Sequence, residues 1–145
     1  MEIVVSKVQS QKELEAVFQI REAVFVLEQQ VDPKEEYDEF ETSSTHFLAK
    51  VDGSDAGTAR WRITEEGIKL ERFAVLSAMR GLGVGQALVR TVLEDIANGR
   101  EGKNKMIYLH AQLPAVPLYQ KFGFKKEGGI FMECGIAHYN MKRSF

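Results

Sequence analysis

The sequence predicts an α/β fold in which a mixed, mostly antiparallel sheet carries helices on both faces. Three observations indicate this class: three strand-like segments joined by tight turns, an amphipathic helix after a glycine-rich turn, and the alternation of strand-like and helix-like segments along the chain. No repeat, low-complexity tract or flexible linker divides the 145 residues. We therefore expect one domain that spans residues 1–145.

The N-terminal part is expected to supply a strand, a helix and an acidic loop. Residues Ile3 to Val8 read as the strand, and Ser10 with Glu13 forms a capping-box pattern that opens the helix. Apolar residues then recur at helical spacing from Leu14 to Phe25. The stretch from Val31 to Ser44 is acidic and contains a proline, so we expect a loop with a short helical turn, which has room to form one wall of a cleft.

Three segments near the middle of the chain read as successive strands of an antiparallel meander. Asp52-Gly53 and Glu65-Glu66-Gly67 separate them as tight turns. In the third strand, strict alternation of side chains places Glu71, Phe73 and Val75 on one face. The strands comprise residues 46–51, 56–64 and 68–75.

The C-terminal half begins with the best-defined helix, in which apolar residues recur at helical spacing from Val84 to Ile96 until Asn98-Gly99 ends it. The remaining elements are a strand, a short helix and two strands, at residues 106–111, 114–122, 124–126 and 138–143. The predicted order is therefore β-α-β-β-β-α-β-α-β-β.

The composition excludes several kinds of partner. A formal net charge of −2 provides no positive field to draw the chain to nucleic acid or an anionic membrane, and no long apolar run indicates export or membrane spanning. The single cysteine, Cys134, favours a reducing compartment, so we expect a cytoplasmic protein. The histidines His46, His110 and His138 have no metal-ligand spacing, and we predict no metal site.

The segment Arg80-Gly81-Leu82-Gly83-Val84-Gly85 lies between a predicted strand and a predicted helix. Glycines at alternate positions remove the Cβ atoms that would keep a ligand from the backbone. The free N–H groups at a helix N-terminus bind anions, and Arg80 adds a positive charge. Because several donors need several acceptor oxygens, a pyrophosphate matches such a turn better than a single carboxylate does.

Two other phosphate-binding turns fit less well. A P-loop requires Lys and then Ser or Thr directly after its last glycine, where this chain has Gln86 and Ala87. The dinucleotide fingerprint needs a third glycine, at a position that Gln86 or Leu88 holds here, and a parallel βαβ unit. The strands that precede this turn instead read as antiparallel.

The remaining pattern, Arg/Gln-x-x-Gly-x-Gly/Ala, is met by Arg80, Gly83 and Gly85 and resembles the acetyl-CoA pyrophosphate loop of the GNAT superfamily. The segment from Ala111 to Phe124 looks like the second cofactor motif of that family, and the element order matches over nearly the whole chain. The resemblance implies a GNAT-like three-layer fold whose sheet is splayed where acetyl-CoA inserts. It also implies that acetyl-CoA is the co-substrate.

A narrower resemblance is to the ElaA-like (YjcF-like) acetyltransferases of bacteria. It rests on four segments, at residues 21–29, 59–62, 110–112 and 135–138. This match implies a bacterial protein but supplies no acceptor.

The family resemblance implies where acetyl-CoA binds. The backbone of Phe73 and Val75 would pair with the pantetheine arm, and the Val75 N–H would donate to the thioester oxygen. Tyr119 stands where the family places the tyrosine that protonates the CoA thiolate; the structural alternative is a half-buried tyrosine of an amphipathic helix. The cofactor-binding residues are thus predicted to be Phe73, Ala74, Val75, Arg80, Gly81, Leu82, Gly83, Val84, Gly85, Gln86, Gln112 and Tyr119.

Glu71 is the candidate general base, because strand alternation puts it beside Phe73 and Val75. The alternatives are that Glu71 pairs with a neighbouring Lys or Arg, and that ordered water accepts the proton. Glu28 and an acidic run could attract a cationic amine, although charge runs are usually solvated surface. The run consists of Glu35, Glu36, Asp38, Glu39 and Glu41.

Two arginines, Arg60 and Arg62, flank Trp61 on a predicted strand. They would either stack or pair near the cleft or be the exposed arginines of an ordinary strand.

The function predicted from these features is transfer of an acetyl group from acetyl-CoA to an amine by direct attack in a ternary complex. An acetyl-Cys134 intermediate has no support in the surrounding sequence. The acceptor would be a small-molecule or peptide amine, and a homodimer is common in the family. The alternatives are a non-catalytic acyl-CoA sensor and a nucleotide-binding switch that would require magnesium.

Overall fold

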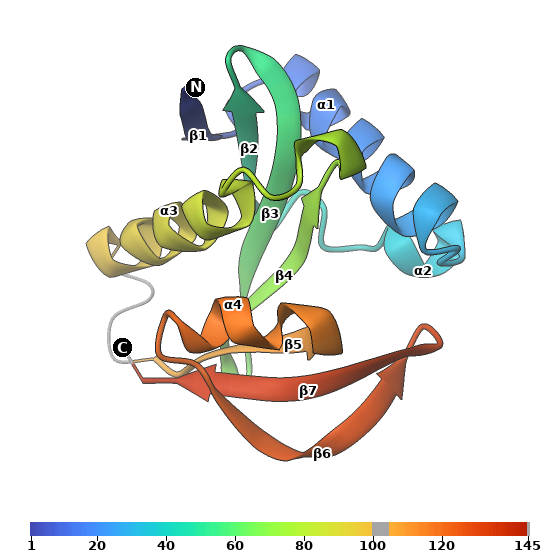
Figure 1. Ribbon diagram of the computed structural model, residues 1–145. Helices are drawn as coiled ribbons and strands as arrows, with labels where there is room; N and C mark the ends of the chain where they lie inside the picture. Colours follow the sequence, from blue (N-terminus) through green and yellow to red (C-terminus); the bar gives the residue numbers. More distant parts are fainter. Residues whose placement is uncertain (100–104, 145) are drawn as a thin grey trace.

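Seven strands form one sheet in the order β1-β2-β3-β4-β5-β7-β6 (Figure 1). The computed structural model describes residues 1–99 and 105–144. Every neighbouring pair is antiparallel except β4 and β5, which confirms the mixed, mostly antiparallel sheet. The strands are β1 (Ile3–Lys7), β2 (Thr45–Val51), β3 (Ser54–Thr64), β4 (Gly67–Val75), β5 (Ile107–Gln112), β6 (Lys125–Glu133) and β7 (Ile136–Arg143).

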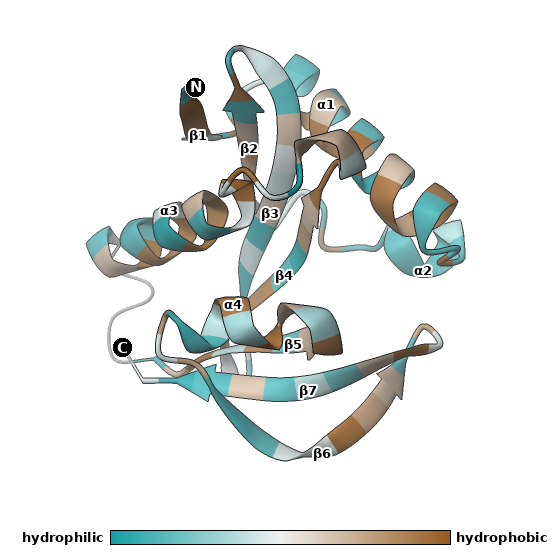
Figure 2. Ribbon diagram, in the orientation of Figure 1, coloured by the Kyte–Doolittle hydropathy of each residue, from teal (hydrophilic) through white to brown (hydrophobic). Residues whose placement is uncertain are grey.

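The two longest helices cover opposite faces of the β1–β4 part of the sheet (Figure 1), and each carries both hydrophobic and hydrophilic residues (Figure 2). Among the residues that the structure describes, no helix is long and apolar enough to cross a membrane. The helical elements are α1 (Gln11–Arg21), the π-helix η1 (Glu22–Glu28), α2 (Pro33–Glu36), the 3₁₀ turn η2 (Ser77–Met79), α3 (Val84–Asn98), the 3₁₀ turn η3 (Leu113–Ala115) and α4 (Val116–Gln120).

The capping box predicted for the first helix is confirmed. The Glu13 N–H donates to Ser10 Oγ at 3.1 Å, and the Glu13 carboxylate accepts from the Ser10 hydroxyl and the Gln9 N–H. The helix then widens into η1, which extends it to Glu28, three residues beyond the expected stretch. A π-helical turn in this position re-aims the side chains that follow, and such turns are frequent at functional sites.

Two apolar clusters hold the layers together, one on each face of the sheet. Leu88 and Val92 of α3 pack with Ile68 on one face, and Val17 of α1 packs with Leu48 on the other. Each of these side chains is at most 2% exposed, so each contributes about 1.5–3 kcal/mol by leaving water.

A β-bulge interrupts β4. Arg60 of β3 lies opposite Glu71, but Thr58 lies opposite Ala74, so one residue of β3 faces two of β4. At this point Arg72 adopts a left-handed conformation with φ of 59°, which is uncommon for a residue other than glycine. The alternation of side chains therefore changes phase within the strand.

This bulge makes the expected common face of Glu71, Phe73 and Val75 wrong. Glu71 binds Arg60 on the face that α1 and α2 cover. Phe73 and Val75 instead pack against the apolar cluster beneath α3. Strict period-two alternation fails here because the extra residue rotates the rest of the strand.

The sheet forks between β4 and β5. These strands pair in parallel over only three residues each, Ile68–Leu70 with Ile107–Leu109, and then separate. Beyond the fork, β5, β7, β6 and α4 form one half of the molecule, and β1–β4 with α1 and α3 form the other (Figure 1). The predicted splay of the sheet is therefore present, and it positions the candidate site.

Candidate active site

The glycine-rich turn presents open backbone at the start of α3. Gly81 and Gly83 have φ of 79° and 96°, where residues with a Cβ are strained. A Cβ at Gly81 would meet no atom within 4 Å, and one at Gly83 would meet only Ile3 at 3.9 Å, so the space outside the turn is clear. No side chain of the described residues caps the helix at Gly83, which leaves its first N–H groups as donors for an anion.

Gly85 has a different role from the other two glycines. A Cβ there would lie 3.3 Å from Leu118 Cδ2, so the missing side chain lets α3 approach α4. The sequence attributed all three glycines to ligand approach. The structure shows that the third glycine also serves helix packing.

Arg80 links the turn to η1 and to the end of β4. Its guanidinium donates to both carboxylate oxygens of Glu28 at 2.6 and 2.7 Å, and its Nε donates to the Val75 carbonyl at 3.0 Å. The hydrogen bond from Arg80 lowers the pKa of Glu28. Glu28, considered from sequence as an attractor of amines, is thus already paired with the arginine of the turn.

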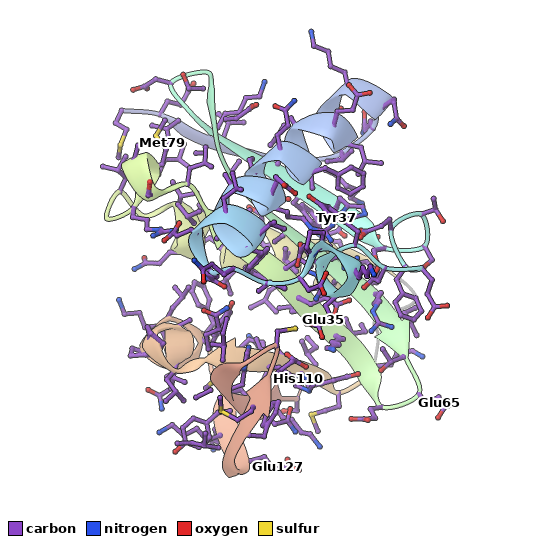
Figure 3. All side chains as sticks on the ribbon, turned by 90° about the vertical axis from the view of Figure 1, so that its right-hand side faces the viewer. Glu35, Tyr37, Glu65, Met79, His110 and Glu127 are labelled. Atoms are coloured by element: carbon purple, nitrogen blue, oxygen red, sulfur yellow. The ribbon has the colours of Figure 1, made fainter. Side chains whose placement is uncertain are left out.

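A cavity of about 330 Å³ opens at the fork between β4 and β5, a volume within the range of small-molecule sites. Its walls come from both halves of the molecule. Figure 3 shows Glu35 on the helical side of this opening and His110 on the side of β5, β6 and β7. The expected contribution of the acidic loop to a cleft wall is confirmed, because α2 lines this cavity.

Tyr119 lines the same cavity from α4. Its ring meets Phe73 and Phe124 edge-to-face at centroid distances of 5.9 and 6.0 Å, and the residue is only 6% exposed. Burial raises the pKa of the phenol above its usual value, so the hydroxyl keeps its proton at neutral pH.

Glu71 is held by cations on three sides. Its carboxylate accepts from Arg60 at 2.8 Å and from Arg62 at 2.5 Å, and Lys69 lies 3.4 Å away. Although burial opposes the charged form, these cations lower its pKa to about 2. A carboxylate of this kind accepts a proton poorly at neutral pH, so the structure favours the ion-paired alternative over a base.

Three carboxylates of the acidic run, those of Glu36, Asp38 and Glu41, belong to an ion-pair network around two buried arginines, while Glu35 and Glu39 are exposed. Arg21 is fully buried and binds the carboxylates of Glu36 and Glu41 at 2.6 and 2.7 Å. Arg60, also fully buried, binds Glu41 at 2.8 Å and Asp38 at 2.6 Å. The solvated-surface interpretation was therefore wrong for these three carboxylates, because sequence spacing does not reveal the two arginines that approach from α1 and β3.

Arg60 and Arg62 differ in their surroundings, although both were considered as exposed residues. Arg60 is fully buried, whereas the guanidinium of Arg62 lies 3.8 Å from the ring centroid of Phe40 and 2.5 Å from Glu71. Trp61 faces the other way and donates to Asp95 at 3.0 Å. The pairing alternative holds for both arginines.

Replacing Arg60 by Met is expected to lower the free energy of unfolding by about 3–5 kcal/mol, because the partly buried carboxylates of Asp38, Glu41 and Glu71 would lose the fully buried cation that they share. Urea unfolding followed by circular dichroism would measure the change. Arg90→Met, on the exposed face of α3, is the matched control and should change stability by less than about 0.5 kcal/mol. Equal stability of the two variants would contradict a structural role for the network.

The four remaining residues that were predicted to bind the cofactor lie in different parts of the structure. The side chain of Ala74 is buried in the α1 cluster, so only its backbone can serve a ligand. Leu82 is 39% exposed at the tip of the turn, and Gln86 lies in the first helical turn of α3. Gln112 exchanges side-chain hydrogen bonds of 3.3 and 2.9 Å with Gln29, which ties β5 to the end of η1 across the cavity.

The structure brings together two histidines that the sequence treated as scattered. His110 and His138 both approach Glu133, at 3.1 and 3.7 Å, while His46 bonds to the Glu41 carbonyl elsewhere. Within residues 1–99 and 105–144, no three His, Cys, Asp or Glu side chains are placed so that they could hold a metal ion together. Sequence spacing could not reveal the His110–Glu133–His138 cluster, because the pairing of β5, β6 and β7 creates it.

Cys134 lies in the turn between β6 and β7, beside this cluster. Desolvation and the neighbouring Glu35 carboxylate raise the pKa of its thiol to about 11. The thiol is therefore protonated at neutral pH, and the structure adds no support for an acetyl-cysteine intermediate.

Comparisons with known proteins agree with this fold. Residues 6–145 match the family described as "Acetyltransferase (GNAT) domain". Bacillus subtilis YjcF, described as an uncharacterized N-acetyltransferase, is 37% identical over 99% of both chains. The crystal structure of Escherichia coli ElaA is 30% identical, covers 98% of this chain and 99% of its own, and superposes with a TM-score of 0.85.

A Bacillus subtilis acetyltransferase solved in complex with CoA has the same fold, with a TM-score of 0.70 at 18% identity over 99% of both chains. The predicted resemblance to the ElaA-like branch is confirmed by the relatives YjcF and ElaA. The chain therefore belongs to the GNAT acetyltransferase family.

Proposed function

We propose that the protein is an N-acetyltransferase that passes the acetyl group of acetyl-CoA directly to an amine within a ternary complex. The proposal rests on one observation: the last residues of β4 connect the glycine turn to the cavity. The Val75 carbonyl contacts Arg80 of the glycine turn, and Phe73, two residues earlier, contacts Tyr119 in the cavity.

In this proposal the pyrophosphate binds the N–H groups at the start of α3, and the pantetheine arm runs along the end of β4 toward the fork. The amine attacks the thioester carbonyl, the Val75 N–H stabilises the oxyanion, and the C–S bond breaks. Tyr119 donates its proton to the departing thiolate. A Bacillus subtilis acetyltransferase of the same fold, solved with CoA, supports the choice of donor.

The proposed acceptor is a small-molecule or peptide amine that enters from the side of η1 and α2. The proposed compartment is the cytoplasm. The cavity is open between the two halves of the molecule, so it admits acceptors of very different size. The choice among them is made by experiment.

A thiol-release assay with acetyl-CoA and a panel of polyamines, amino acids, aminoglycosides and peptides tests the proposal. We expect amine-dependent release of CoA thiol, and acetylated product by mass spectrometry. Calorimetry should show binding of CoA but none of ATP or GTP with magnesium. Tight CoA binding without turnover on any amine would favour an acyl-CoA sensor, and preference for a nucleotide would contradict the choice of ligand.

A further inference from the structure

The cluster of His110, Glu133 and His138 lines the cavity and takes no part in the proposed binding of CoA. Figure 3 shows His110 on the other side of this opening from Glu35. The Phe131 ring lies between the two imidazoles. It meets His110 edge-to-face at 5.0 Å and stacks on His138 at 5.8 Å. These contacts fix the position of His110 in the wall.

His110 occupies the fork itself. It is the first residue of β5 beyond Leu109, where pairing with β4 stops. Because side chains alternate along a strand, His110 and Gln112 lie on the face of η1 and α2, as the contact between Gln112 and Gln29 shows. Leu109 and Ala111 lie on the opposite face, in the apolar cluster that contains Tyr119.

Tyr119 and His110 therefore reach the cavity from opposite faces of the sheet. Tyr119 lies on the side of α3, whose N-terminus would hold the pyrophosphate. His110 lies on the side from which the acceptor would enter. An acid for the thiolate and a base for the amine need this separation, since they act on the two sides of the reacting carbonyl.

The hydrogen bond to Glu133 decides which nitrogen of His110 is free. Nδ1 lies 3.1 Å from Glu133 Oε1, and a carboxylate only accepts, so Nδ1 carries the proton in the neutral ring. Nε2 then holds a lone pair, and no group of the described residues hydrogen-bonds to it. The bond from His110 also lowers the pKa of Glu133, which keeps this acceptor ionised.

The neighbouring candidates are either less exposed or already ion-paired: the side chain of His138 is 8% exposed, against 27% for His110. His138 uses Nδ1 on the Ile136 carbonyl at 2.7 Å and turns Nε2 toward Glu133. Glu71 is held by Arg60, Arg62 and Lys69.

We propose that His110, oriented by Glu133, is the general base that removes the proton from the acceptor amine. The inference rests on the proposed acetyl transfer. As the amine nitrogen bonds to the thioester carbon, His110 Nε2 takes one N–H proton, the C–S bond breaks, and the thiolate takes the Tyr119 proton. His110 then releases its proton to water, and Tyr119 regains one from water, so the products are the amide and CoA thiol.

The proposal predicts a pH dependence, because only neutral His110 accepts a proton. The rate constant kcat/KM should rise with pH along one limb and then level off. The other charged and titratable groups that line the cavity, besides two arginines, are Glu35 and Glu36 of α2, Asp38 just after it, Lys69 and Glu71 of β4, Tyr119 of α4, Glu133 of β6, Cys134 of the turn that follows and His138 of β7. Arg62 and Arg72 also line it, and both are paired with carboxylates.

The test compares pH profiles of kcat/KM for wild type, His110→Gln, Glu133→Gln and His138→Gln. The acceptor is an amine that the wild type acetylates and whose own pKa lies below the pH range of the assay, so that ionisation of the amine adds no rising limb. His110→Gln should lower kcat about 100-fold and remove the rising limb, with CoA affinity unchanged by calorimetry. Glu133→Gln should move the limb to lower pH, because the neutral amide stabilises the imidazolium less. His46→Gln, a histidine outside the cavity, is the matched control and should keep both rate and limb.

A rising limb that survives in His110→Gln, or that disappears only in His138→Gln, would overturn the assignment. If His110→Gln loses CoA binding as well, a second variant, His110→Ala, is assayed with added imidazole. Rescue of its activity would indicate that only the base is missing, and absence of rescue would count against His110. An inactive wild type would instead refute the acetyl transfer itself, and the assignment would fall with it.

Discussion

Gly83→Val is expected to weaken CoA binding more than about 100-fold, a loss of about 2.7 kcal/mol. Gly83 has φ of 96°, a conformation in which a β-branched residue is strongly strained. Its Cβ would also project into the open space where we propose that the pyrophosphate approaches the N–H groups of α3. Isothermal calorimetry with CoA would measure the effect.

Two further variants separate strain from blockage. Gly53→Val places the same residue at φ of 83° in the β2–β3 turn, where no atom lies within 4 Å of the new Cβ. It should lower the melting temperature but leave CoA affinity intact. Gly83→Asn relieves the strain, since asparagine tolerates the left-handed region, yet still adds a side chain. Wild-type affinity in Gly83→Asn would mean that strain alone explains the loss.

Tyr119→Phe should reduce kcat about 100-fold, while the Kd for CoA changes less than about threefold. The substitution removes only the hydroxyl, and the edge-to-face contacts with Phe73 and Phe124 remain available to the ring. Steady-state thiol release and CoA calorimetry on the same preparation would give both quantities.

Tyr139→Phe provides the control, because Tyr139 lies on β7 with Lys126 over its ring and does not line the cavity. It should keep wild-type turnover. An unchanged kcat in Tyr119→Phe would show that its phenol is not the acid. A parallel loss of CoA affinity would instead indicate a tyrosine that packs against the cofactor.

Local patterns were sufficient for most of the fold. The capping box at Ser10, the two tight turns of the meander and the periodicity of α3 depend on neighbours in the sequence, and each element appears where these patterns place it. The glycine turn is local in the same sense, because its conformation follows from residues 80–85 and the helix that begins there. A local pattern also located Tyr119 on a short helix.

The sequence did not reveal the surroundings of Glu71 and of the acidic run. The bulge at Arg72 carries no glycine signal, so the change of face within β4 is invisible in the pattern. Arg21 and Arg60 meet the acidic run only because α1 and β3 pack beside it. Whether a charged residue is solvated or buried depends on partners from elsewhere in the chain, and a single sequence does not specify them.

The sequence by itself determined the order of the elements and the turn from Arg80 to Gly85, because short-range periodicity and spacing encode them, and the resemblance of its motifs to a known family indicated the family. Only the tertiary structure decided that Glu71 is ion-paired with neighbouring cations and that His110 lies at the fork beside Glu133. Both facts arise from strand pairing between distant segments, where register sets which side chains meet. Local sequence thus specifies the turn that we propose binds the donor, and strand pairing assembles the cluster that we propose faces the acceptor.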